Sequence, residues 1–151
     1  MSDTAILTIQ PIVAADQGQW RALWQQYLAI YQTELPDATY SETFRRILAG
    51  EADTCGCIAF SGACAVELVH YLHHQNFWNI TPTCHLPDVF TAPEARGKGV
   101  AWALIQAVFS ASAKDGISDV YWLTNETNYA DRILYDQVGV KTPFIVYERV
   151  Q

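Results

Sequence analysis

The residues whose types most clearly permit chemistry lie at positions 96–101, in the run Arg-Gly-Lys-Gly-Val-Ala. This run joins an apolar stretch, residues 86–91, to an amphipathic helical pattern. The first turn of a helix has N–H groups without intrahelical partners and carries the positive end of the macrodipole, so it binds anions. The two glycines carry no Cβ and let the backbone approach a bulky phosphate, while the arginine and the lysine add positive charge. The run therefore predicts a phosphate-binding turn.

Two common phosphate-binding patterns are excluded by the same residues. A P-loop requires Ser or Thr after its lysine, whereas Lys98 is followed by Gly99. A dinucleotide fingerprint requires a third small residue, and Trp102 occupies that position. The turn therefore belongs to another class of phosphate ligand.

Cysteines and histidines raise the alternative of a metal site: Cys55, Cys57, Cys64, Cys84, His70, His73 and His74. Their spacing does not form the paired Cys-x-x-Cys or His-x-x-x-His units typical of structural zinc. The cysteines lie in or beside apolar segments, which indicates buried free thiols in a reducing compartment. We therefore expect no metal.

The first part of the chain predicts one strand and two helices. Residues 5–12 have the pattern of a strand, and Asp16 can cap a helix whose apolar positions continue to Tyr31. The aromatic residues of this helix form either a core stripe or part of a substrate wall. Residues 39–42 have the form of a capping box and open a second helix, which Gly50 ends.

The rest of the chain predicts further strands at residues 55–60, 63–74, 83–91, 120–124 and 144–149. The first two of these form a hairpin around Ser61 and Gly62. One helix follows the glycine turn and ends near residues 114–116, and another spans residues 129–137 before Gly139. No linker or repeat interrupts the order β-α-α-β-β-β-α-β-α-β. We therefore expect one α/β domain over residues 1–151, with a mixed central sheet flanked by about four helices.

Composition and net charge limit the partners and the location that this protein can have. The chain has 151 residues, half of them apolar, a formal net charge of -7 and a pI of about 4.8. An acidic surface argues against nucleic-acid binding and suits a cationic substrate. The first residues lack the pattern of a signal peptide, and no apolar run approaches the length of a membrane span. We expect a cytoplasmic protein without a membrane partner.

Several motifs together resemble one family. Read as Arg-x-x-Gly-x-Ala, residues 96–101 resemble the acyl-CoA pyrophosphate loop of the GNAT superfamily of N-acyltransferases. Residues 70–78 and 84–90 are similar to the strand pair of small GNATs that acetylate polyamines, amino acids or protein amines. Residues 121–128 and 133–136 are similar to the second cofactor segment of that branch. The predicted order of elements is also that of GNAT domains.

The resemblance implies roles for particular residues. The main chain of Val89, Phe90 and Thr91 would pair with the pantetheine arm, and Arg96, Gly97, Lys98, Gly99, Val100 and Ala101 would hold the pyrophosphate. Asn128 matches the asparagine that binds the pantetheine side, and it could also cap the following helix. Tyr135 matches the tyrosine near the acyl-CoA sulfur; its alternative is a core aromatic. A thiol pKa of roughly 8.5 and a tyrosine pKa near 10 make it a candidate general acid.

The general base is less well defined, because family members commonly have a glutamate where this chain has Pro87. Proline cannot accept a proton, so the candidates are Asp88, His85 and Glu126, with Asp88 first by position. A structural role for Asp88 stays open. Strand alternation predicts that His85 and Asp88 lie on opposite faces of the strand.

The resemblance implies transfer of an acetyl group from acetyl-CoA to a primary amine, by direct attack in a ternary complex. The amine would belong to a small molecule or to a protein lysine or N-terminus. The alternative is a noncatalytic acyl-CoA-binding or interaction module that has lost its base. A single C-terminal strand, where many relatives have a hairpin, predicts a homodimer in which a second subunit completes the acceptor pocket.

Overall fold

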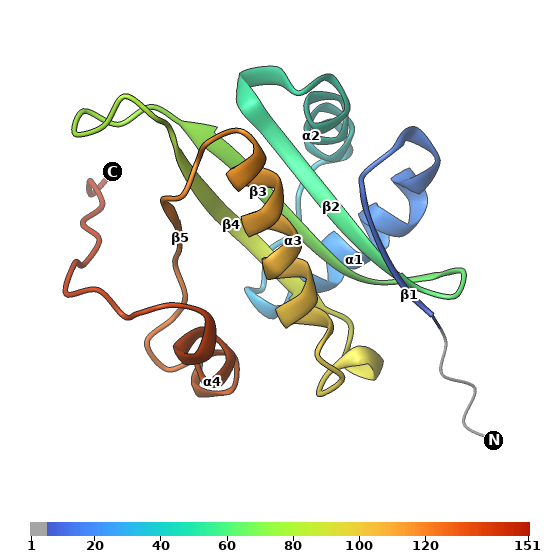
Figure 1. The fold of residues 1–151 in the computed structure, drawn as a ribbon. Coiled ribbons are helices and arrows are strands. Elements are labelled where there is room, and N and C mark those ends of the chain that lie inside the picture. The colour runs from blue at the N-terminus through green and yellow to red at the C-terminus, as the bar shows by residue number, and fades with distance from the viewer. Residues whose placement is uncertain (1–5) are drawn as a thin grey trace.

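The computed structural model describes residues 6–151, which form a mixed five-stranded sheet with helices on both faces (Figure 1). The strands lie in the order β1 (Leu7–Pro11), β2 (Thr54–Ser61), β3 (Cys64–His74), β4 (Thr83–Thr91) and β5 (Val120–Trp122). The first four pair antiparallel, and β5 pairs parallel with β4. The α-helices are α1 (Gln17–Ile30), α2 (Asp37–Ala49), α3 (Val100–Lys114) and α4 (Tyr129–Val138). The predicted α/β class and the mixed sheet are confirmed.

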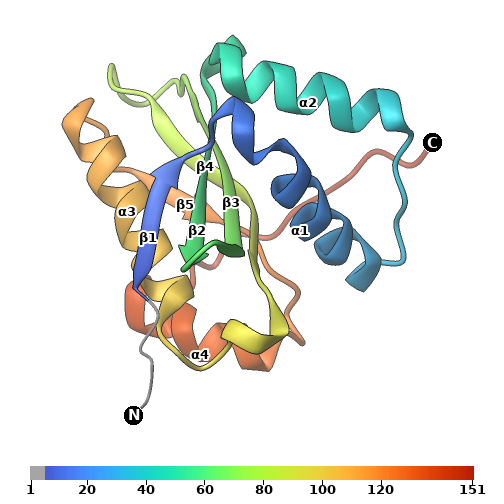
Figure 2. The same cartoon turned by 90° about the vertical axis from the view of Figure 1, so that its right-hand side faces the viewer.

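Helices lie on both sides of the sheet (Figure 2), and each face of the sheet contributes to a buried core. Helices α1 and α2 cover one face, where Trp20 and Phe44 pack with Leu68 of β3. Helix α3 covers the other face, where Leu104 packs with Val69. Neighbouring residues of β3 thus point into different cores, because side chains alternate along a strand. This double burial explains the nearly continuous apolar character of β2 and β3.

One helix start and one helix cap differ from the sequence prediction. Helix α2 opens two residues before the predicted capping box: Pro36 is its N-cap, and the Pro36 carbonyl already accepts from Thr39 N–H at 2.9 Å. At α1, Asp16 holds the N-cap position, but its carboxylate accepts from Val13 N–H at 2.8 Å and makes no cap bond to the helix. In both cases a backbone group just before the helix makes the hydrogen bond: the Pro36 carbonyl at α2 and the Val13 N–H at α1.

The strand predicted at residues 144–149 is wrong. The chain after α4 has no strand pairing, and it runs along the outer side of β5 (Figure 1). Phe144 is 81% exposed and Tyr147 is 89% exposed. Aromatic and β-branched residues favour a strand only when a neighbouring edge is available to pair with. Here the adjacent strand β5 is only three residues long, shorter than the predicted 120–124.

Candidate active site

A cleft opens where β4 and β5 separate. The two strands pair from Cys84 and Val120 to Leu86 and Trp122, and β4 then continues to Thr91 while the chain after β5 turns toward α4. The cavity between them has a volume of about 830 Å³. Val89, Phe90 and Thr91 line it, as the sequence led us to expect. An open strand edge of this kind can bind an extended ligand arm through main-chain hydrogen bonds.

The glycine turn forms one end of this cavity. Gly97 and Gly99 have φ angles of 74° and 76°, a left-handed conformation that glycine adopts without strain. Gly99 is also the N-cap of α3, so the free N–H groups of its first turn lie beside the cavity. Arg96 Nε donates to the Thr91 carbonyl at 3.3 Å, which ties the turn to the end of β4.

The residues of the turn are not equivalent. Arg96, Gly97, Gly99, Val100 and Ala101 line the cavity, whereas Lys98 does not. Lys98 is exposed, so its charge acts from outside the cavity wall.

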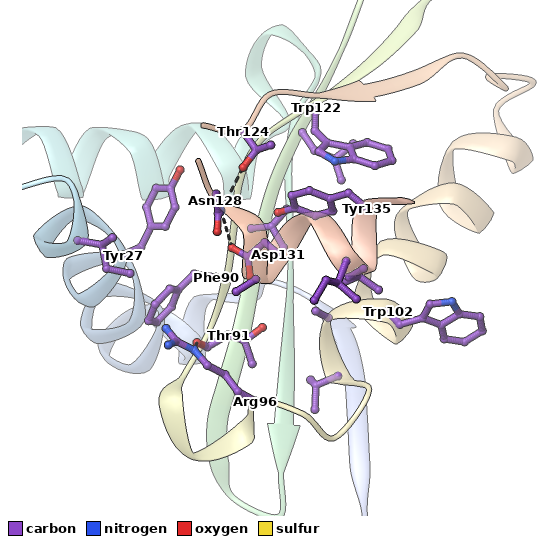
Figure 3. A pocket seen from close by; sticks show the side chains of 18 of the residues that line it. Tyr27, Phe90, Thr91, Arg96, Trp102, Trp122, Thr124, Asn128, Asp131 and Tyr135 are labelled. Carbon is purple, nitrogen blue, oxygen red and sulfur yellow. Dashed lines mark hydrogen bonds between the residues drawn. The ribbon is translucent and has the colours of Figure 1, made fainter. Parts of the chain in front are cut away.

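Asn128 lies at the start of α4, within the cavity wall (Figure 3). Its side-chain amide donates to Thr124 Oγ1 at 3.1 Å and to Asp131 Oδ2 at 2.8 Å. It holds the N-cap position without a side-chain cap bond. Both donors of the amide are therefore occupied, whereas its oxygen makes no hydrogen bond within the described chain and is free to accept one.

Tyr135 reaches the cavity from α4 and packs against Trp122, with ring centroids 5.6 Å apart (Figure 3). Gly139 allows this packing, because a Cβ there would lie 2.8 Å from the Trp122 ring. Burial raises the pKa of the Tyr135 phenol, and the nearby Asp131 carboxylate raises it further. The phenol therefore holds its proton firmly and can donate a hydrogen bond into the cavity.

The aromatic stripe of α1 divides between core and cavity. Trp20 and Trp24 are buried, whereas Tyr27 and Tyr31 line the cavity on the side opposite α4. The Tyr27 hydroxyl donates to the Pro87 carbonyl at 3.4 Å. Burial, and then the charge of Asp88, raises the pKa of Tyr27. The core interpretation is therefore confirmed for Trp20 and Trp24, while Tyr27 and Tyr31 stay candidates for a substrate wall.

The prediction that His85 and Asp88 lie on opposite faces is wrong. In the register of β3 and β4, Leu72 pairs with His85 and His70 pairs with Asp88. Residues directly opposite each other on paired strands share a face of the sheet. His70 and Leu72 are two positions apart, so they share a face, and their partners Asp88 and His85 lie on that face too. A bulge in β4, where the register shifts by one residue, makes this possible. This face carries α1. Pro87 lies within the bulge, where a missing N–H is tolerated.

The three candidate bases differ in their surroundings. Asp88 is half-buried and bonded to His70, 2.8 Å from its Nδ1. His85 stacks on Tyr121 at 4.6 Å with a buried Nε2, and burial lowers its pKa. Glu126 is exposed and outside the cavity lining. Asp88 also lies outside the lining, but its neighbours Pro87 and Val89 belong to it.

One buried acid was missed by the sequence reasoning. Glu67 is fully buried on β3, opposite Thr91, and neither carboxylate oxygen has a hydrogen-bond partner in the described chain. Burial raises its pKa to about 8, so the group is neutral at pH 7. A charged residue type in the middle of an apolar strand was the available signal.

The cysteines are all free, but they are not all buried as predicted. Cys57 and Cys84 are buried and Cys55 is half-buried, whereas Cys64 is exposed at the hairpin. Within residues 6–151, no three His, Cys, Asp or Glu side chains come together closely enough to hold a metal ion. In the same range, each helix is too short or too polar to cross a bilayer.

Comparison with known proteins identifies the family that uses this architecture. Residues 19–140 match the acetyltransferase (GNAT) family. The chain belongs to this family. It is also 30% identical to the D-amino-acid N-acetyltransferase HPA3 of Saccharomyces cerevisiae, over 95% of this chain and 90% of that protein. The chain is thus a GNAT acetyltransferase of the acetyl-CoA-dependent type, with acetyl-CoA as its donor substrate.

Solved structures of GNAT proteins share the fold. AAC(6')-Iy in complex with the bisubstrate analogue CoA-S-monomethyl-acetylneamine superposes with a TM-score of 0.84 at 21% identity, over 97% of this chain and 99% of that chain. The ribosomal-protein-alanine N-acetyltransferase from Brucella melitensis biovar Abortus 2308 superposes with a TM-score of 0.78 at 18% identity, over 97% and 100% of the two chains. These similarities concern the fold.

Proposed function

We propose that this GNAT acetyltransferase transfers an acetyl group from acetyl-CoA to a primary amine by direct attack in a ternary complex. One observation carries the proposal. A single cavity joins the glycine turn, the open edge of β4 and the Tyr135 phenol. A pyrophosphate, an extended arm and a thioester sulfur follow one another along CoA in the same order.

The Val89–Thr91 main chain and the first turn of α3 would hold the donor. The neutral amine nitrogen attacks the thioester carbonyl, a C–N bond forms, and the C–S bond breaks. The amine loses one proton and the departing thiolate needs one. Since the pKa of Tyr135 is raised, we assign it to hydrogen-bond donation that stabilises the departing thiolate, and the phenol keeps its proton. The thiolate of CoA then takes its proton from water, because a thiol pKa of roughly 8.5 leaves it mostly protonated at neutral pH.

We assign the proton acceptor for the amine to Asp88. It lies on the α1 face of the sheet, next to the cavity residues Pro87 and Tyr27. Asp88 lies between two lining residues, Pro87 and Val89, and its charge acts on the lining residue Tyr27. In the described chain Glu126 has no such contact and is exposed in the loop before α4, and burial disfavours a charged His85. Pro87, at the usual glutamate position, is the observation that favours the noncatalytic alternative.

The experiment that tests the proposal measures thiol release from acetyl-CoA with a panel of amines. D-amino acids are the first compounds to test, because of the similarity to the yeast enzyme, followed by polyamines, aminoglycosides and peptides with free lysines or N-termini. We expect turnover with at least one small-molecule amine. CoA binding without turnover on any acceptor would favour the noncatalytic module instead.

We also infer that the protein forms a homodimer through its C-terminal segment. Residues 144–147 are Phe-Ile-Val-Tyr, and each is between 64% and 89% exposed. Monomers rarely expose a continuous apolar stretch of this kind. A second copy would cover these side chains and supply a longer pairing edge than the three-residue β5.

A cytoplasmic location is likewise proposed. Its support is the donor substrate together with four free cysteines, one of them exposed, which suit a reducing compartment.

A further inference from the structure

A buried chain of three side chains connects α1 to β4. Trp20 Nε1 donates to His70 Nε2 at 2.8 Å, and His70 Nδ1 lies 2.8 Å from Asp88 Oδ2. Trp20 is completely buried and His70 is 6% exposed. The side chain of Asp88, at the outer end, is 20% exposed. The chain thus runs from the core to the face of β4 beside the cleft.

Trp20 decides which nitrogen of His70 carries the proton. An indole N–H is a donor only, so Nε2 must present its lone pair to it. In the neutral imidazole the proton then lies on Nδ1, which donates to the Asp88 carboxylate. An imidazolium would place a second N–H against the indole N–H. The hydrogen bond from Trp20 therefore selects the neutral ring with the Nδ1 proton.

Two tryptophan rings also pack against the imidazole of His70. Trp20 lies 5.9 Å away, centroid to centroid, and Trp24 meets the ring edge-on at 5.2 Å. Trp24 contributes packing alone, since its Nε1 is buried without a partner in the described chain. Both tryptophans therefore pack against His70, but only Trp20 donates a hydrogen bond to it.

No arginine or lysine of the described chain pairs with Asp88. Helix α1 contains one basic residue, Arg21, and its guanidinium is bonded to Asp37. A neutral donor orients a carboxylate while leaving its charge unpaired, whereas a guanidinium would stabilise the charged form and weaken the base. Other titratable side chains also face this region: Tyr27 and Tyr31 from α1, Tyr40 from α2, His74 from β3, His85 from β4 and Tyr121 from β5.

We propose that Trp20 and His70 are positioning residues that hold Asp88 as the acceptor of the amine proton. The proposal rests on the acetyl transfer proposed above. His70 holds Oδ2, and the proton that leaves the amine nitrogen goes to Oδ1. His70 keeps its own proton throughout, so it orients the base without relaying the charge.

Comparison of Trp20→Phe with Trp24→Phe tests this role. Both variants replace a buried indole by a smaller ring, but only Trp20→Phe removes a hydrogen bond from His70. We expect Trp20→Phe to lower kcat roughly 10- to 100-fold, since misplacing a reacting group costs that order. Trp24→Phe keeps an aromatic ring against His70 and removes only an N–H without a partner in the described chain, so it should retain kcat.

The pH profile separates positioning from general damage. In Trp20→Phe the Nε2 atom is free to take a proton, and the imidazolium would pair with Asp88 and weaken the base. Activity should then fall at a higher pH on the acid side than in the wild type, while Trp24→Phe keeps the wild-type profile. Equal kcat and equal profiles in the two variants would overturn the positioning role.

NMR of the imidazole nitrogens in the wild-type protein is an independent test, because it requires neither turnover nor a folded variant. We expect a proton on Nδ1 of His70 and a lone pair on Nε2 at pH 7. A proton on Nε2 would overturn the proposal. An inactive wild type would instead contradict the proposed function, so the two failures are distinguishable.

Discussion

At the scale of single residues, burial decides what each functional side chain can do. Tyr135 is a phenol whose pKa is raised by burial beside Trp122 and by the Asp131 carboxylate. Such a group is always protonated at neutral pH, so it is always available as a hydrogen-bond donor. Its contribution to catalysis is then greatest when negative charge develops on the sulfur.

We therefore expect Tyr135→Phe to keep the affinity for CoA while lowering kcat at least about tenfold. The ring still packs against Trp122, so the cavity wall is preserved, and only the donor is lost. Calorimetry gives the CoA affinity and steady-state kinetics give kcat. An unchanged kcat would remove Tyr135 from the chemistry.

Glu67 affects stability through the same physics. Its pKa is raised from 4.5 to about 8 by burial, so both the folded and the unfolded chain are protonated below pH 4.5. As the pH rises from 4.5 to 8, the unfolded chain loses this proton first, and the free energy of unfolding falls by up to about 1.4 kcal/mol per pH unit.

Glu67→Gln should remove this part of the pH dependence. We expect urea unfolding at pH 5, 6, 7 and 8 to show a smaller decline in the variant than in the wild type. The exposed Glu94→Gln serves as the control for loss of a carboxylate. A decline as steep in Glu67→Gln as in the wild type would show that the buried acid is not its source.

At the scale of elements, the glycine turn and α3 act as one anion-binding unit. Gly99 is the residue of this unit whose substitution we expect to affect both stability and anion binding, because it combines a φ of 76° with a place in the cavity wall. Gly62, in the β2–β3 hairpin, has a similar φ of 61° and equally open surroundings. The two positions therefore form a matched pair, one in the cleft and one outside it.

We expect Gly99→Ala and Gly62→Ala to lose similar stability, about 1 to 2 kcal/mol, because both force alanine into the left-handed region. Only Gly99→Ala places a methyl group where the pyrophosphate must approach. Its Kd for CoA should rise roughly tenfold, a cost of about 1.4 kcal/mol. Equal affinities in the two variants would place the pyrophosphate elsewhere.

Elements that depend on local signals were predictable from the sequence. The glycine turn, the N-cap position of Asn128 and the apolar stripe of α3 follow from neighbours within a few residues, and the structure contains all three.

The β4 bulge is different, because it depends on register with β3. It places His85 and Asp88 on the same face of the sheet, where alternation had predicted opposite faces. For the same reason, the sequence could not bring Trp20, His70 and Asp88 together across 68 residues of chain.

At the scale of the whole molecule, the C-terminal segment carries apolar side chains that the rest of the described chain does not cover. The sequence predicts a strand there, but the edge strand beside it, β5, is only three residues long and does not pair with it. Residues 144–147 therefore combine strand propensity with 64% to 89% exposure. A second copy would both pair with this segment and bury its side chains, which makes the homodimer the arrangement that removes both costs.

We expect light scattering at micromolar concentration to give the mass of a dimer for the wild type. A double substitution, Phe144→Asp with Ile145→Lys, should give a monomer, because it places opposite charges in the apolar interface without changing the net charge. Leu48→Asp, on the exposed side of α2, is the control and should stay dimeric. If the second subunit completes the acceptor pocket, the monomeric variant should also raise KM for the amine while retaining the affinity for CoA. A wild type that is already monomeric at this concentration would contradict the dimer, and the amine would then have to bind within the cleft of one chain.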